Sequence, residues 1–255
     1  MFLGEPYTRV TSVKIILYKS DDPPALDGTG GTPLGSGHVA KTVNMDVSNW
    51  TVTGLTATND NIITGTTNGT LTVTATHAAI WTLTDLLLDV VELTAPIEVP
   101  SGQPFQIPAG GIDWTLSGGW CSTWGNKVLD HIITGAAITW PTSYEHILVN
   151  PAGTASVAGT PITGTSYAPF VSTVGTDDFA IGTNEDDGDP QITNATTFAF
   201  VNAGSDWTDP EGHEILNEAT GERCFFLDYG TTVPINDGNG VSWPTGVFVV
   251  RLTTP

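Results

Sequence analysis

Val13-Lys14-Ile15-Ile16-Leu17-Tyr18 is the stretch that decides the fold class. Its β-branched and aromatic side chains favour an extended strand. The run Asp21-Asp22-Pro23-Pro24 ends that strand, because proline has no backbone N–H to give to a sheet. Thr70-Leu71-Thr72-Val73-Thr74 alternates polar and apolar residues with a period of two, as half-buried strands do. Both stretches predict a mostly β protein.

The composition agrees with this fold class. Only 13% of the residues are charged, about half the usual share. Thr, Asn, Ser and Gly therefore provide most of the polar surface. Thr, Gly and Pro are abundant while Lys and Met are few, which favours strands and turns over helices.

The net charge excludes several classes of partner. Seven Lys and Arg stand against 27 Asp and Glu, for a formal charge of −20. Binding of nucleic acid needs cations that neutralise phosphates, and anionic membranes attract basic segments. We therefore expect neither nucleic acid nor a membrane as a partner. The acidity suits mutual repulsion between free copies, or docking onto a basic protein surface.

No targeting or membrane-spanning segment is predicted. Met1-Phe2-Leu3-Gly4-Glu5-Pro6 has neither the basic start nor the apolar stretch of a signal peptide. The apolar run Leu86-Leu87-Leu88-Asp89-Val90-Val91 is short and interrupted by an aspartate. We expect a soluble chain that is synthesised in a cytoplasm.

One short helix is predicted near residues 122–134. Ser122 or Thr123 can cap its start, and Gly135 lies where a helix ends. Four apolar residues fall on one face at helical spacing, namely Val128, Leu129, Ile132 and Ile133.

The second half of the chain repeats the turn signals of the first half in the same order. The matched stretches are Thr32-Pro33-Leu34 with Thr160-Pro161-Ile162, Thr94-Ala95-Pro96-Ile97 with Thr232-Val233-Pro234-Ile235, Pro108-Ala109-Gly110 with Pro244-Thr245-Gly246, and Leu116 with Leu252. The last three matches lie 136 to 138 residues apart. This regularity predicts an internal duplication into two tandem sandwich- or barrel-like β domains, 1–118 and 119–255. Coincidence in a chain rich in Thr, Gly and Pro is the alternative.

A series of short motifs in the second half resembles a known family. The motifs are Asn126-Lys127-Val128-Leu129-Asp130-His131-Ile132, Tyr144-Glu145-His146-Ile147-Leu148-Val149, Thr165-Ser166-Tyr167-Ala168-Pro169, Asp206-Trp207, Glu214-Ile215-Leu216-Asn217-Glu218-Ala219-Thr220-Gly221 and Cys224-Phe225-Phe226-Leu227-Asp228-Tyr229-Gly230. In this order they resemble the opening helix and the strands of a widespread family of small tailed-phage structural proteins. The resemblance covers residues 122–254. It departs from the family at Pro169, where the family has arginine, and at the acidic insert 184–189.

The resemblance implies a function but no active residues. It implies a non-enzymatic virion protein, made in the cytoplasm of a bacterial host, that serves as a capsid decoration (cement) subunit or as a tail-fibre or tail-accessory subunit. The implied partners are the major capsid protein or tail proteins, with further copies of the chain in a homo-oligomer. It implies no cofactor.

Motifs of catalysis and metal binding are not found in the sequence. It has no HExxH pair, no GxSxG elbow and no phosphate-binding glycine loop, so we expect no enzyme. The five histidines are interpreted as surface or strand residues. Four carboxylates of the acidic insert could offer oxygen ligands to Ca²⁺, namely Glu185, Asp186, Asp187 and Asp189. A solvated loop is the leading interpretation of this insert, and a calcium site is the alternative.

Tryptophan and cysteine side chains are the remaining candidates for interface, binding or disulfide positions. Among eight tryptophans, Trp120 and Trp124 flank the predicted domain junction. We expect Trp120, Trp124 and Trp207 to pack at an interface, between the domains or against a neighbouring subunit. The alternative is a carbohydrate-binding or receptor-binding module that uses Trp and Asp clusters. Cys121 and Cys224 form no disulfide framework, so buried free thiols are expected, with a single bridge as the alternative.

Overall fold

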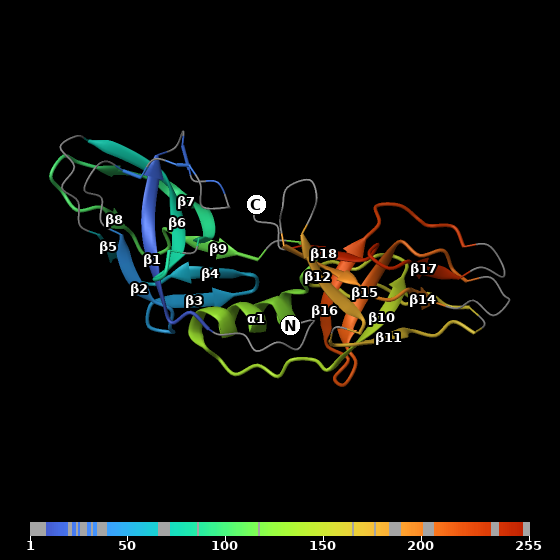
Figure 1. Ribbon diagram of the computed structural model, residues 1–255. Coiled ribbons are helices and arrows are strands. Elements are labelled where there is room, and N and C mark those ends of the chain that lie inside the picture. Colours follow the sequence, from blue (N-terminus) through green and yellow to red (C-terminus); the bar gives the residue numbers. More distant parts are fainter. Residues whose placement is uncertain are drawn as a thin grey trace.

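The structure is a computed structural model of the chain, shown in Figure 1. It describes residues 9–19, 22–23, 25, 30–31, 33–34, 40–65, 72–85, 87–116, 118–164, 166–175, 177–183, 190–200, 207–235 and 240–251. The described part consists mostly of antiparallel strands with a single helix, which confirms the predicted fold class. The one helix in this part is not long and apolar enough to cross a membrane.

The first unit comprises nine strands of the described chain. They are β1 (Ser12–Lys19), β2 (Lys41–Asn44), β3 (Trp50–Thr53), β4 (Thr56–Asn59), β5 (Ile63–Thr64), β6 (Val73–Thr82), β7 (Leu87–Val99), β8 (Gln106–Ile107) and β9 (Asp113–Thr115). They form sheets of order β2-β1-β6-β7, β3-β4-β9 and β5-β8. The predicted strand at 13–18 is therefore a central strand, paired on both sides.

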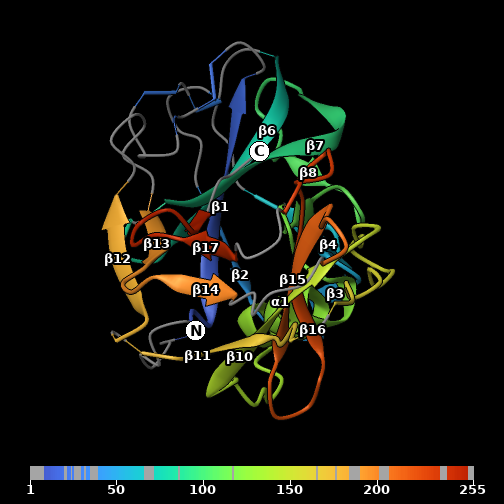
Figure 2. The same cartoon turned by 90° about the vertical axis from the view of Figure 1, so that its right-hand side faces the viewer.

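The second unit comprises the next nine described strands. They are β10 (Ser143–Val149), β11 (Phe170–Thr173), β12 (Phe179–Thr183), β13 (Pro190–Asn194), β14 (Phe198–Phe200), β15 (Gly212–Asn217), β16 (Arg223–Asp228), β17 (Val241–Trp243) and β18 (Val249–Arg251). Their sheets have the order β11-β10-β15-β16, β12-β13-β18 and β14-β17. Figure 2 shows the first of these sheets on one side of the unit and the strands β12 and β13 on the other.

The two units share one topology. Adding nine to each strand number of the first unit reproduces the three sheets of the second unit, strand for strand. A shared topology is what an internal duplication would produce. The duplication and the boundary at 118/119 themselves stay predictions.

A buried asparagine organises one turn of the first unit. The amide Nδ2 of Asn59 donates hydrogen bonds to Pro108 O at 2.8 Å and to Asn61 O at 2.9 Å. Its Oδ1 accepts one from Ile112 N at 2.8 Å. Gly110 lies between these partners with a φ of 72°, a left-handed conformation that favours glycine, and donates to Asn59 O at 2.8 Å.

The second unit contains the same arrangement. Asn194 Nδ2 donates to Thr196 O at 2.7 Å and to Pro244 O at 2.9 Å, and its Oδ1 accepts from Phe248 N at 2.9 Å. Gly246 has a φ of 79° and donates to Asn194 O at 2.9 Å. The sequence match between 108–110 and 244–246 therefore falls on equivalent turns.

A second sequence match also falls on equivalent positions. Leu34 N donates to Leu17 O at 3.2 Å, and Ile162 N donates to Leu148 O at 3.0 Å. In both units, the backbone N–H of the residue after a Thr-Pro pair thus donates a hydrogen bond to a carbonyl near the end of the first strand of the unit. Two matches remain. The match of 94–97 with 232–235 does not fall on equivalent elements, because 94–97 lie within β7 whereas 232–235 follow β16 and belong to no strand. The match of Leu116 involves Leu252, which lies outside the described residues.

The helix α1 (Ser122–Thr134) forms where the sequence predicts it. It ends at Gly135, which has the left-handed φ of 81° and donates to His131 O at 3.1 Å. The predicted cap at Ser122 or Thr123 is wrong by one or two residues. The N-cap is Cys121, in an extended conformation and without a side-chain hydrogen bond, so backbone geometry alone starts the helix.

Two neighbouring faces of α1 are apolar, and each packs into a different core. Leu129 and Ile133 belong to the core of the first unit. Trp124 and Val128 belong to the core of the second unit. Gly125 approaches the first unit so closely that a Cβ there would lie 2.2 Å from a methyl carbon of Leu55. Figure 1 shows α1 between the two units, so both cores depend on one element.

Candidate functional site

The junction between α1 and the second unit contains two of the predicted tryptophans. Trp120 forms an isolated β-bridge with Phe225 of β16, and the two ring centroids are 4.8 Å apart. Trp124 is only 1% exposed and meets Trp140 edge to face at 6.1 Å. Trp120 is half-buried. Both indoles thus stabilise the junction from within the chain.

Trp207 lies elsewhere, in the core of the second unit. Its ring is 4% exposed and packs edge to face against Tyr167 at 5.2 Å. Trp124 and Trp207 are buried inside the folded chain, Trp124 on the helix that packs into both cores and Trp207 within the second unit. Their expected role at an interface stays a prediction. All eight tryptophans are described, and each is at least partly buried.

A buried ion pair connects β15, β16 and the loop after β10. Arg223 Nη2 lies 2.6 Å from Glu214 Oε1 and donates to Thr154 O at 3.0 Å. The same Oε1 atom accepts a hydrogen bond from Gly159 N at 2.7 Å. A Cβ at Gly153 would lie 2.1 Å from this oxygen, so the loop can approach only with glycine there. The pair therefore holds the 153–159 loop against the sheet.

A recess of about 350 Å³ opens beside this ion pair, at the start of α1. Its lining consists of Cys121, Ser122, Thr123, Ala155, Ser156, Ala158, Glu222 and Arg223. Burial raises the pKa of the Cys121 thiol to about 11, so the thiol stays protonated at neutral pH and is a poor nucleophile.

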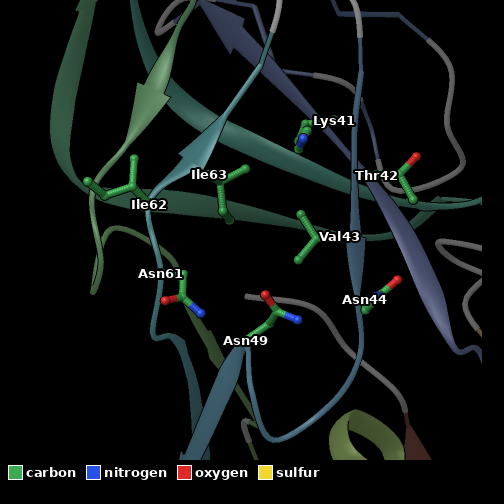
Figure 3. A pocket seen from close by; sticks show the side chains of 8 residues that line it. All are labelled: Lys41, Thr42, Val43, Asn44, Asn49, Asn61, Ile62 and Ile63. Atoms are coloured by element: carbon green, nitrogen blue, oxygen red, sulfur yellow. The ribbon is translucent and has the colours of Figure 1, made fainter.

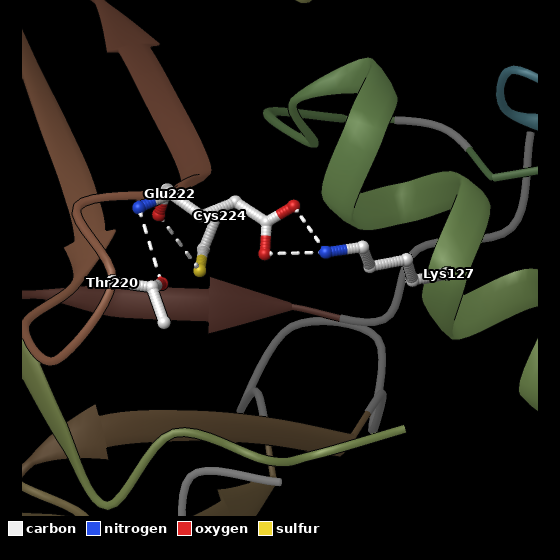
Figure 4. A network of polar contacts seen from close by, with 4 residues as sticks. All are labelled: Lys127, Thr220, Glu222 and Cys224. Atoms are coloured by element: carbon white, nitrogen blue, oxygen red, sulfur yellow. Dashed lines mark hydrogen bonds and ion pairs between the residues drawn. The ribbon is translucent and has the colours of Figure 1, made fainter. Parts of the chain in front are cut away.

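Cys224 lies opposite Cys121, whose N donates to Cys224 O at 3.0 Å. Both cysteines are free and buried. Burial raises the pKa of the Cys224 thiol to about 12. Figure 4 shows this thiol beside the ion pair of Lys127 and Glu222, in which Lys127 Nζ lies 2.6 Å from Glu222 Oε1. This corner therefore ties α1 to β16 and carries no activated sulfur.

A second recess lies between β2 and β5 of the first unit. It has a volume of about 180 Å³ and is lined by Lys41, Thr42, Val43, Asn44, Asn49, Asn61, Ile62 and Ile63. Figure 3 shows the carboxamides of Asn49 and Asn61 at one end of it, whereas the side chain of Asn44 points away from Val43 to the other side of β2. Asn49 and Asn61 donate to Asp46 Oδ1 and Ser48 O respectively, so much of their donor capacity serves the loop itself.

Two of the histidines that the sequence analysis interprets as surface or strand residues form a buried polar chain. His146 on β10 and His213 on β15 are each 1% exposed. His146 Nδ1 lies 3.1 Å from His213 Nε2, and His146 Nε2 lies 2.8 Å from Ser172 Oγ of β11. The sequence contained a signal, because alternation along β10 places His146 on the face of the buried Tyr144 and Leu148.

Metal binding finds no support within the described ranges. No three His, Cys, Asp or Glu side chains there come together as metal ligands would. The candidate calcium ligands Glu185, Asp186, Asp187 and Asp189 lie outside the described residues, so that alternative stays a prediction.

Comparisons with known proteins found no relative. No protein-family model, no curated protein and no solved structure matches the chain.

The buried ion pair gives a testable expectation. Replacing Glu214 by glutamine should lower the free energy of unfolding by about 2 kcal/mol, because Arg223 keeps its charge while losing its anionic partner. Urea unfolding at neutral pH, followed by circular dichroism, measures the change. Lys127→Met is the matched control, since Lys127 is half-exposed and its pair with Glu222 should contribute less than about 1 kcal/mol. Equal losses in both variants would contradict the assigned role.

Proposed function

We propose that the protein is a non-enzymatic structural subunit of a tailed-phage virion, either a capsid decoration (cement) protein or a tail-fibre or tail-accessory subunit. The observation that carries this proposal is the tandem of two β units that share a topology and are joined through α1. Because α1 contributes to both cores, it fixes the two units relative to each other. A subunit of this kind presents two similar surfaces at a fixed spacing, which suits binding to a repeating protein lattice.

Both units have end strands and exposed apolar side chains that are available for contacts with other subunits. β2 and β11 are end strands of their four-stranded sheets as described, and an end strand offers backbone groups for pairing. The exposed large apolar side chains of the described chain are Val47, Ile62, Leu83, Val157, Val171, Leu227, Val233 and Val247. Val171 belongs to β11 itself, where it is 48% exposed. Burial of such groups against coat or tail proteins would stabilise the particle.

The charge supports a protein partner with a basic surface. A formal charge of −20 on one subunit disfavours contacts between free copies and favours a complementary positive patch. Assembly should therefore weaken as the salt concentration rises.

Particles with and without the protein test the proposal. Purified wild-type particles should contain it in stoichiometric amounts by quantitative mass spectrometry. Particles from a deletion strain should release their DNA at a lower temperature if it is a cement protein, or adsorb poorly with intact heads if it is a tail subunit. Purified protein should bind the depleted particles saturably and reverse the defect. Absence of the protein from purified particles would overturn the proposal.

A carbohydrate-binding or receptor-binding module is the second candidate. The amide-lined recess between β2 and β5 favours it, because carboxamides hydrogen-bond readily to sugar hydroxyls. Glycan-array binding that is lost in Asn49→Ala would support this candidate over a purely structural role. Saturable binding to depleted particles without any glycan signal would exclude it.

A further inference from the structure

Three core positions differ in chemistry between the two units. In the first unit they are occupied by Ile15 on β1, Val43 on β2 and Ala78 on β6, all buried. β1 and β10 have the same alternation of buried residues, and Leu17 and Leu148 bind equivalent loops. This alignment places His146 at the position of Ile15.

The registers of the neighbouring strands extend the alignment. Ala78 pairs with Leu17 in the first unit, and His213 pairs with Leu148 in the second. Val43 and Ser172 likewise pair with equivalent residues of β1 and β10, since Val13 lies two residues before Ile15 and Tyr144 two residues before His146. The second unit therefore has His146, Ser172 and His213 where the first unit has Ile15, Val43 and Ala78.

The fold does not need a polar chain at these positions, because the first unit has the same topology with apolar residues there. Burying polar groups without need is unfavourable, and they persist only when they are hydrogen-bonded. The chain from Ser172 Oγ through His146 to His213 Nε2 meets that condition. The difference between the units thus points to a property that the second unit has and the first unit lacks.

The hydrogen bonds of the chain fit two neutral rings. Each neutral imidazole has one donor and one acceptor nitrogen, so the chain is satisfied in either direction. Reversing the direction of the chain would give hydrogen bonds to one added proton, but the charge of that proton would be buried among apolar and aromatic side chains. A second proton would place two N–H donors against each other at the 3.1 Å contact between His146 and His213. The site therefore opposes full protonation by geometry as well as by charge.

Among the described residues, no counter-ion faces the pair. The groups that face the pair among the described residues are Ser172 of β11, the rings of Phe198 and Phe200 of β14, Trp243 of β17, Phe170 and Phe248. Within each strand the neighbouring carboxylates, Glu145 and Glu214, alternate to the opposite face of the sheet, where Glu214 already pairs with Arg223. Burial lowers the pKa of His213 to about 3, and burial together with the charge of His213 lowers the pKa of His146 well below its ordinary value.

We propose that His146 and His213 form a pair that stays neutral while buried and binds protons on exposure, through which acid loosens the second unit. Because the site takes up protons only on opening, acid favours the opened state. Ser172 belongs to the end strand β11, so opening of the chain first weakens the attachment of that strand. This inference goes beyond the proposed structural function and does not depend on it.

The sign of the effect follows from the direction of the shifts. Both histidines have a lower pKa in the folded chain than the value of 6.5 that applies when they are exposed. The unfolded state therefore binds more protons below about pH 6.5, and stability falls as the pH falls through this range. With two histidines, each pH unit well below 6.5 reduces the folding equilibrium constant by about 100-fold, down to the pKa values of the folded state.

The test compares the protein with variants that lack the titrating groups. The triple variant His146→Ile, Ser172→Val, His213→Ala installs the residues of the first unit, and His146→Gln with His213→Gln keeps polar groups that do not titrate. Urea unfolding of the full chain is measured between pH 7.5 and 4.5. Well below pH 6.5, the folding equilibrium constant of the native protein should fall by roughly 100-fold per pH unit more than that of the variants.

A direct measurement covers the case in which a variant fails to fold. Nuclear magnetic resonance of the native protein should show both rings neutral at pH 5, with signals that disappear only as the second unit unfolds. Equal pH dependence of the native protein and a folded variant would overturn the proposal. So would a native ring that titrates at its ordinary pKa while the fold stays intact.

Discussion

Replacing Asn194 by leucine is expected to lower the free energy of unfolding by about 4 kcal/mol. The substitution keeps a side chain of similar size but removes every hydrogen bond of the buried amide. Thr196 O and Trp243 O lose a donor, and Phe248 N loses its acceptor at 2.9 Å. Pro244 O also loses a donor but keeps the bond from Val247 N at 3.0 Å. The N–H of Phe248 stays buried without its acceptor, which costs more than the loss of an exposed hydrogen bond. Chemical denaturation at neutral pH measures the effect.

The first unit provides a replicate of this experiment within one chain. Asn59→Leu removes the corresponding bonds to Pro108 O and from Ile112 N and should have a similar effect. Thr245→Val, at an exposed position in the same turn as Pro244, is the control and should change stability by less than about 0.5 kcal/mol. If Asn194→Leu is as mild as this control, the asparagine does not hold the turn.

The sequence predicted what depends on local patterns. The strand at 13–18 follows from its β-branched residues and the prolines after it, and α1 follows from apolar spacing and Gly135. The Pro-Ala-Gly and Pro-Thr-Gly turns were visible as a match between 108–110 and 244–246. Their shared physical cause was not visible, because Asn59 and Asn194 lie about 50 residues from the turns that they hold.

The candidate functional sites also depend on contacts between distant residues, which local sequence patterns do not show. Trp124 looked like an interface residue because it flanks the predicted junction, but it lies four residues before Val128 on the same face of α1 and is buried with it. His146 and His213 are 67 residues apart, and no local pattern indicates that their rings meet. Contacts between distant strands decide such sites, and one sequence contains no direct record of them.

Replacing Trp124 by alanine should lower the free energy of unfolding by about 4 kcal/mol, as removal of large buried aromatic side chains does. Trp124 is 1% exposed and packs in the second core with Val128 and against Trp140. The loss should reach the first unit as well, because the same helix supplies Leu129 and Ile133 to that core. Denaturation followed by circular dichroism gives the total loss of stability.

Hydrogen exchange locates that loss in each unit. The amides of Ile112 in the first unit and Phe248 in the second are held by the buried asparagines and report on their own unit. In Trp124→Ala both amides should exchange faster, and Leu129→Ala, made from the other face of α1, should accelerate both in the same way. Lys127→Ala, on the half-exposed face, should leave both amides nearly unchanged. If Trp124→Ala accelerates Phe248 alone, α1 does not couple the two cores, and the fixed spacing on which the proposed assembly role rests is lost.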